Sequence, residues 1–252
     1  MKLIPLPQCA NLDWPSKGSG IRKEPSEKSS EFRRAWRAGS SKGIVIVKIQ
    51  RFNLLYRIII SLGFVVLHVL YRLRVEGREN IPPQGPCILL PKHQFWTDIP
   101  IVGLAAGKPL FFIAKQELFR YPGVTQFMRL LGAIPLDRIK PIKSLKTFRS
   151  VNHLLKNSEF IVLFPEGTYY HYSLGQGKYR FIENILRFQE NQKWFGEKAI
   201  SFLPMGIAYE KKGLRPKVKV KIGAPLFSNG KVDGPEFTRR LINEIGKLSE
   251  LT

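Results

Sequence analysis

The sequence predicts an α/β fold with a mainly parallel central sheet flanked by helices, over residues 74–252. Three observations support this prediction: short apolar runs alternate with helical patterns, these runs are bounded by Pro, Gly or charged residues, and one late segment alternates strictly between polar and apolar residues. A chain of 252 residues fits one such domain with additional segments and can bury a substantial core.

Short apolar runs are expected to form buried parallel strands, because they lack the polar alternation of a half-exposed sheet. They cover Cys87–Leu90, Leu110–Ala114, Ile161–Phe164 and Ala199–Pro204. The segment Lys217–Ile222 alternates Lys with Val or Ile, so one of its faces is exposed to water. We expect an outer strand there, whose lysines protect a sheet edge from pairing with another chain.

Helical patterns lie between these runs and after the last one. They cover Ile99–Ala106, Leu118–Leu131, Leu145–Lys156, Ile182–Gln189 and a closing amphipathic segment, Glu236–Leu251. In Leu145–Lys156 the apolar residues fall on one face, as a helix that covers a sheet requires. Alternation of helices with buried strands indicates a parallel sheet between helical layers.

The first 73 residues divide into two segments. Residues 1–42 are rich in Ser, Pro, Gly, Lys and Arg and are expected to be a disordered basic tail. A transit peptide is the competing interpretation, which the acidic residues of this stretch disfavour. Residues 43–73 are apolar, and their uncharged stretch Ile58–Tyr71 has 14 residues, fewer than the roughly 20 that span a bilayer. We expect a membrane-associating helical segment in one leaflet, with a buried soluble helix as the alternative.

Composition restricts the partners and the chemistry. The net charge of +22 suits nucleic acid or an anionic membrane surface. The sequence contains an apolar segment besides the basic residues, and it contains no recognisable nucleic-acid-binding motif. We therefore expect a membrane partner and no nucleic acid. Cys9 and Cys87 are far apart and the histidines are scattered, so no metal site is expected. Cys87 lies in an apolar run and is expected to be buried.

The most informative motif is His93-Gln94-Phe95-Trp96-Thr97-Asp98, which places an imidazole and a carboxylate five positions apart. A His that takes a proton from a hydroxyl needs a partner that fixes its tautomer and stabilises the imidazolium. Asp98 can be that partner if the residues between them form a turn. The alternative interpretation is a surface His beside a helix-capping Asp98, since Ile99-Pro100 is a favourable helix start.

Three further blocks follow this motif in order. They are Leu131-Gly132-Ala133-Ile134-Pro135-Leu136-Asp137-Arg138, Phe164-Pro165-Glu166-Gly167-Thr168 and Phe202-Leu203-Pro204-Met205-Gly206-Ile207. In order and spacing, the set resembles the blocks of the glycerolipid acyltransferases, typified by 1-acylglycerol-3-phosphate acyltransferase. Lys115-Gln116-Glu117-Leu118 and Ile222-Gly223-Ala224-Pro225-Leu226 are also similar to stretches of that family. The resemblance covers about residues 74–227.

The resemblance implies a glycerol-3-phosphate acyltransferase-like fold and a membrane-associated O-acyltransferase of phospholipid biosynthesis, with its active site on the cytoplasmic side. Such an enzyme transfers a fatty acyl group from acyl-CoA or acyl carrier protein to the hydroxyl of a lysophospholipid, without a cofactor. His93 is then the general base, and Asp98 holds its other ring nitrogen. Lys115 and backbone amides near His93 are candidate donors to the oxyanion.

The resemblance also implies where the acceptor binds. Glu166 and Thr168 are expected to shape its site, in the loop after a buried strand. Gly167 is expected to keep the backbone accessible there, and an ordinary turn glycine is equally consistent with its position. Arg138 ends a block that matches the family and is the expected phosphate contact, with a solvated surface Arg as the alternative.

Two positions depart from the family's pattern. The family usually has Asn before the catalytic His and Arg after the Glu-Gly-Thr block, where this chain has Lys92 and Tyr169. A phenol cannot replace the planar, permanently charged fork of Arg on a phosphate. Either Arg138, Lys178 or Arg180 compensates, or the acceptor is a different lysophospholipid, a glycolipid or another alcohol. A non-catalytic basic membrane-binding protein is the alternative outside enzymes.

Overall fold

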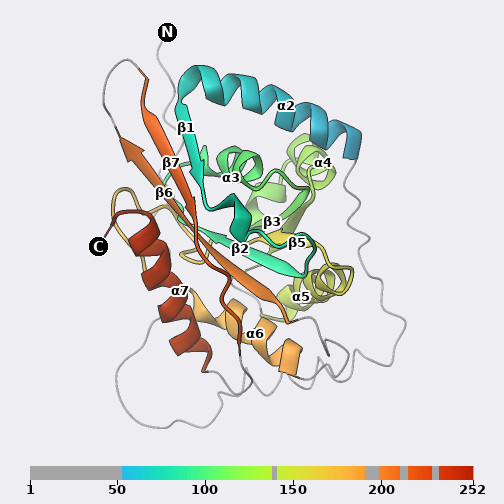
Figure 1. Cartoon of the computed structure of the whole chain (residues 1–252). Coiled ribbons are helices and arrows are strands. Elements are labelled where there is room, and N and C mark those ends of the chain that lie inside the picture. Colours follow the sequence, from blue (N-terminus) through green and yellow to red (C-terminus); the bar gives the residue numbers. More distant parts are fainter. Residues whose placement is uncertain (1–52, 138–140, 191–198, 211–214, 229–232, 252) are drawn as a thin grey trace. The chain divides into compact units, whose positions relative to one another are not determined.

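The computed structural model describes residues 53–137, 141–190, 199–210, 215–228 and 233–251. The described residues all belong to the second of two units of the chain, Gly43–Thr252, which is compact. The predicted basic tail and the first part of the predicted membrane segment, residues 43–52, therefore lie outside the described residues. Within the described part, the second unit is built on a seven-stranded sheet (Figure 1).

The sheet is mainly parallel, as the sequence predicts. Its strand order is β1-β7-β6-β2-β5-β3-β4. Strands β6, β2, β5, β3 and β4 run parallel to one another, whereas β7 pairs antiparallel with β6, and β1 follows the direction of β7. The strands are β1 (Arg72–Glu76), β2 (Cys87–Pro91), β3 (Leu110–Lys115), β4 (Ala133–Leu136), β5 (Phe160–Val162), β6 (Ser201–Glu210) and β7 (Lys217–Ile222).

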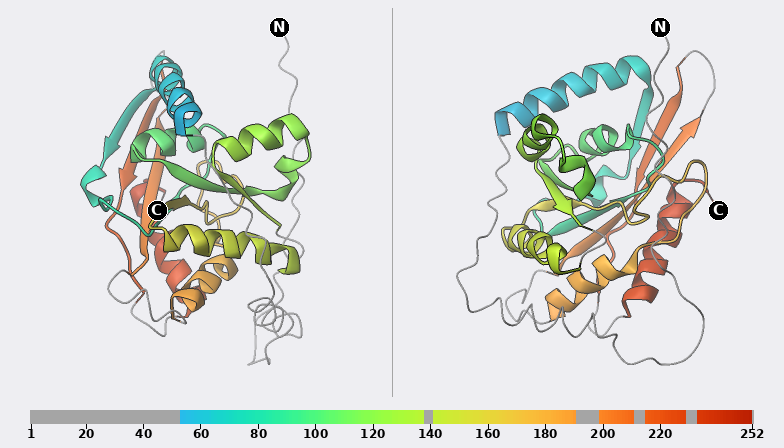
Figure 2. Two further views of the ribbon diagram at one scale, coloured as in Figure 1. Left: turned by 90° about the vertical axis from the view of Figure 1, so that its right-hand side faces the viewer. Right: turned by 180° about the vertical axis from the view of Figure 1, so that it is seen from behind.

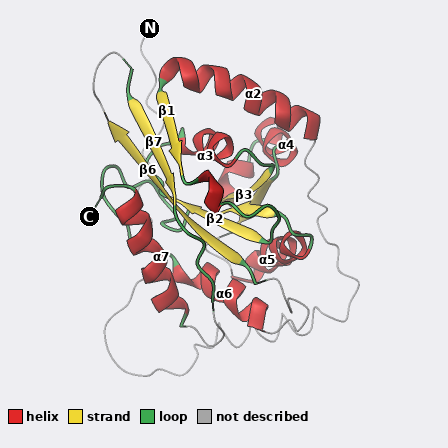
Figure 3. Cartoon of the chain, viewed as in Figure 1, coloured by secondary structure: helices red, strands yellow, loops and turns green. Residues whose placement is uncertain are grey.

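Helices cover both faces of the sheet (Figures 2 and 3). From β2 the chain passes through α3 to β3 and then through α4 to β4, and both steps go in the same direction across the sheet. Because such crossovers are right-handed, α3 and α4 lie on the same face. The path returns through α5 and α6, which lie on the other face with α7. The helices are α2 (Asn53–Leu70), α3 (Asp98–Ala106), α4 (Pro122–Leu130), α5 (Pro141–Lys156), α6 (Tyr179–Glu190) and α7 (Gly234–Leu248), with short 3₁₀ turns η1 (Arg78–Asn80) and η2 (Gln116–Phe119).

The core explains why the central strands are continuously apolar. Every residue of β2 is buried, since helices lie above and below it. Leu89 and Leu203 of neighbouring strands pack with Val102 of α3 in one cluster. Helix α2 lies over α3, where the absence of a side chain at Gly103 lets Ile60 approach closely. Each such fully buried Leu or Val stabilises the fold by roughly 1.5–3 kcal/mol.

The edge-strand prediction for Lys217–Ile222 is wrong. The segment is a strand, and Val218 and Val220 are buried while its lysines are not. It lies between β6 and β1, however, so β1 forms the edge of the sheet. Strand β1, Arg-Leu-Arg-Val-Glu, alternates between charged and apolar residues as β7 does, so the pattern alone does not tell which of the two strands lies at the edge.

Most predicted elements are shifted by a few residues at one or both ends, and two of these shifts have a clear physical cause. The strand β6 runs on to Glu210, past the predicted end at Pro204, because its second half pairs antiparallel with β7. The predicted helix Leu118–Leu131 starts as the 3₁₀ turn η2, and α4 begins only at Pro122. Proline favours the first helical position, because its missing N–H would have no partner there.

We expect Gly206→Ala to lower the free energy of unfolding by about 1–3 kcal/mol, as overpacking does. A Cβ at Gly206 of β6 would lie 2.2 Å from the backbone carbonyl carbon of Leu248, so α7 would have to move away from the sheet. Urea denaturation measures the effect. Gly123→Ala in α4 is the control, because nothing lies within 4 Å of its added Cβ. Equal stability of the two variants would contradict this close packing.

Candidate active site

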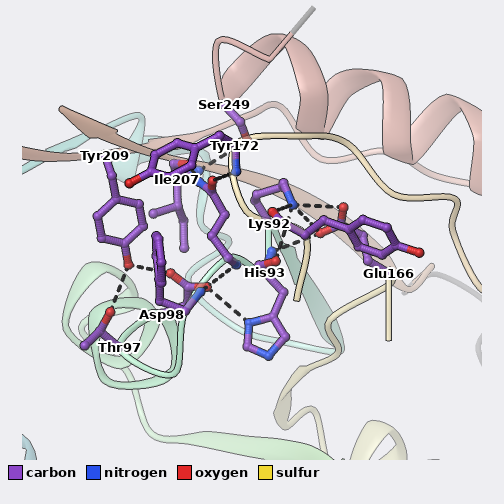
Figure 4. Close-up of polar contacts among 12 residues, drawn as sticks. Lys92, His93, Thr97, Asp98, Glu166, Tyr172, Ile207, Tyr209 and Ser249 are labelled. Carbon is purple, nitrogen blue, oxygen red and sulfur yellow. Dashed lines mark hydrogen bonds and ion pairs between the residues drawn. The ribbon is translucent and has the colours of Figure 1, made fainter. Parts of the chain in front are cut away.

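The predicted His–Asp pair forms at the carboxyl end of the parallel strands, where such sheets place ligand sites. His93 lies in the loop after β2, and Asp98 is the first residue of α3 (Figure 4). His93 Nδ1 lies 3.1 Å from Asp98 Oδ2. The residues between them form the turn that their spacing requires. The structure thus brings the two side chains together, and their catalytic roles remain a prediction.

Asp98 is fully buried and holds the turn in place. Its Oδ2 accepts hydrogen bonds from the backbone N–H groups of Gln94 at 2.5 Å and Phe95 at 2.8 Å. Its Oδ1 accepts from the hydroxyl of Tyr209 at 2.5 Å. These donors fix the carboxylate against the imidazole of His93, so that the ring has one orientation.

The electrostatics of the pair favour a neutral base. Burial lowers the pKa of His93, and the neighbouring Asp98 carboxylate offsets only part of that effect. Because Asp98 accepts from the Nδ1–H group, the neutral ring carries its lone pair on Nε2. A neutral imidazole in this tautomer can take a proton from a hydroxyl.

A buried ion pair lies beneath His93. The side chains of Lys92 and Glu166 are both 0% exposed, and Lys92 Nζ lies 2.9 and 2.8 Å from the two carboxylate oxygens of Glu166. Lys92 Nζ also donates to the carbonyl oxygens of Tyr170 at 3.0 Å and His93 at 3.3 Å. Glu166 accepts from the backbone N–H groups of His93 and Gly175 as well. The pair therefore ties the loop after β2 to the loop after β5.

Aromatic rings flank the imidazole. The rings of His93 and Phe164 are stacked, with centroids 3.8 Å apart. The Tyr169 ring lies 4.3 Å from the His93 ring and is 45% exposed. The position at which the resemblance implies a phosphate-binding Arg is therefore occupied by a phenol in direct contact with the His93 ring.

The remaining predicted site residues lie in different places. Glu166 faces inward to Lys92, so its predicted contact with the acceptor is not part of this arrangement and remains a prediction. Gly167 is buried in a left-handed turn with φ of 74°, a conformation that favours glycine. Thr168 is exposed next to it. Lys115 ends β3, and β5 lies between that strand and β2, so Lys115 is outside the His93 network. Arg138 lies outside the described residues.

Two contacts were not predictable from the motifs. Tyr209 belongs to no block, since it lies beyond Ile207, and the extension of β6 carries it to Asp98. Its hydroxyl also lies 3.1 Å from Thr97 Oγ1, which donates because the tyrosine proton points to Asp98. Lys92 is visible in the sequence only as a departure from the family pattern, and nothing nearby indicates Glu166 as its partner.

The one cysteine in the described part of the chain is not a nucleophile candidate. Cys87 is fully buried in β2, as the sequence predicts, and burial raises the pKa of its thiol to about 12. A thiolate is therefore inaccessible at neutral pH. Among the described residues, no group of three or more His, Cys, Asp or Glu side chains converges as metal ligands would.

We expect Tyr209→Phe to lower the free energy of unfolding by about 1.5–3 kcal/mol, the range for a hydrogen bond to a charged group. Without the Tyr209 hydroxyl, the charge on Asp98 is less dispersed and raises the pKa of His93 more strongly. The acid limb of any His93-dependent activity should then move to higher pH. Tyr121→Phe is the control, because Tyr121 is 70% exposed. An unchanged unfolding midpoint and pH profile in Tyr209→Phe would contradict this role.

Comparisons with known proteins agree with the fold and the motifs. The family model described as Acyltransferase matches residues 72–206. The 1-acyl-sn-glycerol-3-phosphate acyltransferase LPAT1 of Arabidopsis thaliana chloroplasts is 32% identical over 103 residues, which cover 40% of this chain and 29% of that protein. A lyso-ornithine lipid O-acyltransferase of Rhizobium meliloti is 27% identical over 100 residues, which cover 40% of this chain and 34% of that protein. The match thus spans about a third of the length of these relatives.

A solved structure has the same fold. The crystal structure of the 1-acyl-sn-glycerophosphate (LPA) acyltransferase PlsC from Thermotoga maritima aligns with a TM-score of 0.61 and 22% sequence identity, covering 88% of each chain. This agreement confirms the predicted fold class. The family model spans more than half of the 252 residues and contains the segments that supply His93, Asp98 and Glu166. This chain belongs to the Acyltransferase family.

Proposed function

We propose that this protein is a membrane-associated O-acyltransferase of phospholipid biosynthesis, which transfers a fatty acyl group from a thioester to the hydroxyl of a lysophospholipid. The observation that carries the proposal is the contact of His93 Nδ1 with Asp98 at 3.1 Å, in a setting where burial keeps the imidazole neutral. Membership of the Acyltransferase family and the names of its relatives support the reaction class.

The reaction follows from the geometry of the pair. His93 Nε2 takes the proton of the acceptor hydroxyl while its oxygen attacks the thioester carbonyl. The tetrahedral intermediate then collapses, the C–S bond breaks, and the leaving thiolate takes the proton from the imidazolium. Asp98 stabilises that cation, and the acyl group never resides on the protein. A positioned general base of this kind contributes about 10²–10⁴-fold to the rate. Lys115 and backbone amides near His93 remain the candidate oxyanion donors.

The acyl donor is acyl-CoA or acyl carrier protein, and no cofactor takes part. Both donors are acidic, which suits a chain with a net charge of +22. The same charge suits the cytoplasmic leaflet, whose anionic lipids attract basic residues. We therefore place the active site on the cytoplasmic side of the membrane.

Helix α2 supports association with a membrane. Its exposed side carries large apolar side chains at Leu54, Ile58, Leu62, Phe64, Val65, Val66, Val69 and Leu70. Arg57 is exposed beside them. An apolar helix surface with basic neighbours is typical of segments that bind the bilayer interface. No helix in the described part of the chain combines the length and the apolarity that crossing a bilayer requires.

A different acceptor headgroup is the second candidate within the same reaction. Tyr169 contacts His93 where the family pattern has an Arg for phosphate. Among the relatives named above, one is named for a 1-acyl-glycerol-3-phosphate acceptor and one for a lyso-ornithine lipid. The phenol at Tyr169 favours an acceptor without a free phosphomonoester at this place.

The test is acyl transfer by the purified protein from radiolabelled acyl-CoA to lysophosphatidate, lysophosphatidylcholine, lysophosphatidylglycerol and lyso-ornithine lipid. We expect transfer to at least one acceptor, and its loss in His93→Ala. If no transfer from acyl-CoA is detected, the same acceptors are tested with acylated acyl carrier protein as the donor. No transfer from either donor would sink the acyltransferase proposal in favour of a non-catalytic basic membrane-binding protein.

The role of Tyr169 is tested by Tyr169→Arg. If the phenol excludes phosphomonoesters, this substitution should raise kcat/KM for lysophosphatidate by roughly ten- to a hundredfold, as expected for one added charge-assisted contact. Tyr179→Arg is the control, because it makes the same exchange at an exposed Tyr at the start of α6, outside the predicted site. An equal gain in both variants would mean that general charge, not the position beside His93, determines the preference.

A further inference from the structure

Exposed apolar side chains lie in segments that leave the same edge of the sheet as the His93 loop. Trp96, in the loop after β2, is 68% exposed, and Tyr121, which follows β3 and η2, is 70% exposed. Because β2, β3 and β5 are parallel, the loops after them leave the same edge of the sheet. Over the described ranges, the exposed large apolar residues lie in α2 or in segments that begin at this edge, apart from Tyr179 and Phe227.

Helix α4 is the unusual element of this group. An amphipathic helix of a globular protein normally buries its apolar side, yet none of the residues Pro122–Leu130, all of them described, is buried. Val124 and Phe127 are 45% and 48% exposed, and they continue the series begun by Leu118 and Tyr121. We call these four residues the η2–α4 surface. The packing of the domain does not account for it.

The η2–α4 surface lies on the same side of the sheet as α2. The crossover direction places α4 on the face that α3 covers, and α2 lies over α3. In both views of Figure 2, α2 and α4 lie in the upper half of the described part, opposite α5 and α6. A single flat partner on this side of the sheet can therefore contact α2, α4 and the loops around His93 together.

The charges around this surface identify its occupant. Arg120 and Arg129 are exposed within the same segment, and Arg57 is exposed on α2. Basic residues next to aromatic and aliphatic side chains suit the interface of an anionic bilayer, where amphipathic rings such as Trp96 and Tyr121 are favoured. A second copy of this chain would bring like charges together, since the net charge is +22.

We propose that the η2–α4 surface, together with Trp96, is a second lipid contact beside α2, which seats the mouth of the His93 site on an anionic bilayer. The inference rests on the proposed function, which supplies the reason to hold the His93 site at the bilayer. A lysophospholipid then reaches His93 without leaving the membrane. The contact itself is measurable without any substrate.

The first experiment is flotation of the full chain with vesicles of phosphatidylcholine and phosphatidylglycerol. The double variant Tyr121→Ser/Phe127→Ser should lower the vesicle partition coefficient by about ten- to a hundredfold, from the apolar area that it removes.

A second experiment separates this contact from catalysis. Acyl transfer is measured with the acceptor embedded in vesicles and with the acceptor dispersed in detergent. We expect Tyr121→Ser/Phe127→Ser to lose activity on vesicles and keep it in detergent. Tyr121→Ser alone, a change before the first residue of α4, should act in the same direction, and equal melting temperatures confirm that both variants fold.

The outcomes are distinguishable. Vesicle binding equal to that of the wild type in Tyr121→Ser/Phe127→Ser and in Tyr121→Ser would overturn the proposal. Self-association that both variants abolish, without any change in vesicle binding, would also overturn it and assign the surface to a second copy of the chain. Reduced vesicle binding in a protein that transfers no acyl group would support the lipid contact and contradict only the proposed enzyme function.

Discussion

Replacing His93 by Gln is expected to lower kcat/KM for acyl transfer by about 10²–10⁴-fold, the range over which a positioned general base acts. Gln preserves most of the size of the side chain and can still face Asp98, but it cannot take a proton. Because Gln fills most of the space that the His93 ring occupies against Phe164, the fold should persist. Initial rates and a thermal melt measure the two effects. Activity close to wild type would rule out His93 as the base.

The pH profile gives an independent test of the same role. The base acts when neutral, so activity falls as the pH drops through the pKa of His93. Burial lowers that pKa below its ordinary value of 6.5, and the acid limb of kcat/KM is therefore expected below pH 6.5. Asp98 raises the pKa, so Asp98→Asn should move the acid limb to still lower pH while reducing the rate. A limb that stays in place would contradict the electrostatic coupling of the pair.

Lys92→Met is expected to lower the free energy of unfolding by about 3–5 kcal/mol, because it leaves the buried carboxylate of Glu166 without its cation. A loss of this size is a large part of the roughly 5–15 kcal/mol that stabilises a typical domain. The same substitution releases the loop that carries His93, so activity should fall as well. Urea denaturation and acyl-transfer rates measure the two losses.

The double variant Lys92→Met/Glu166→Gln is the control for this prediction. It removes both charges and keeps one oxygen, which can accept from the backbone N–H of either His93 or Gly175, so it should be more stable than Lys92→Met. Lys247→Met breaks an exposed ion pair with Glu244 and should have little effect. If Lys92→Met were as stable as the double variant, the buried pair would not be what holds the two loops together.

Local sequence patterns determined most of the helices and strands and the pairing of His93 with Asp98. The buried strands are short and continuously apolar because helices cover both faces of the sheet. Each of these strands can therefore be recognised from its own residues. His93 and Asp98 are close in sequence, and backbone hydrogen bonds within one turn bring them together. Relations of this kind depend on neighbouring residues alone, and the sequence therefore predicts them.

Tertiary structure alone decided which distant side chains pair with the buried polar groups of the site. Lys92 and Glu166 are 74 positions apart, and Tyr209 and Asp98 are 111 apart. The place of β1 at the sheet edge and the inward direction of Glu166 likewise depend on which segments lie side by side. A buried charge or hydroxyl requires a partner, but no local pattern specifies which distant side chain supplies it. That choice follows from strand order and from the length of β6, which only the folded chain establishes.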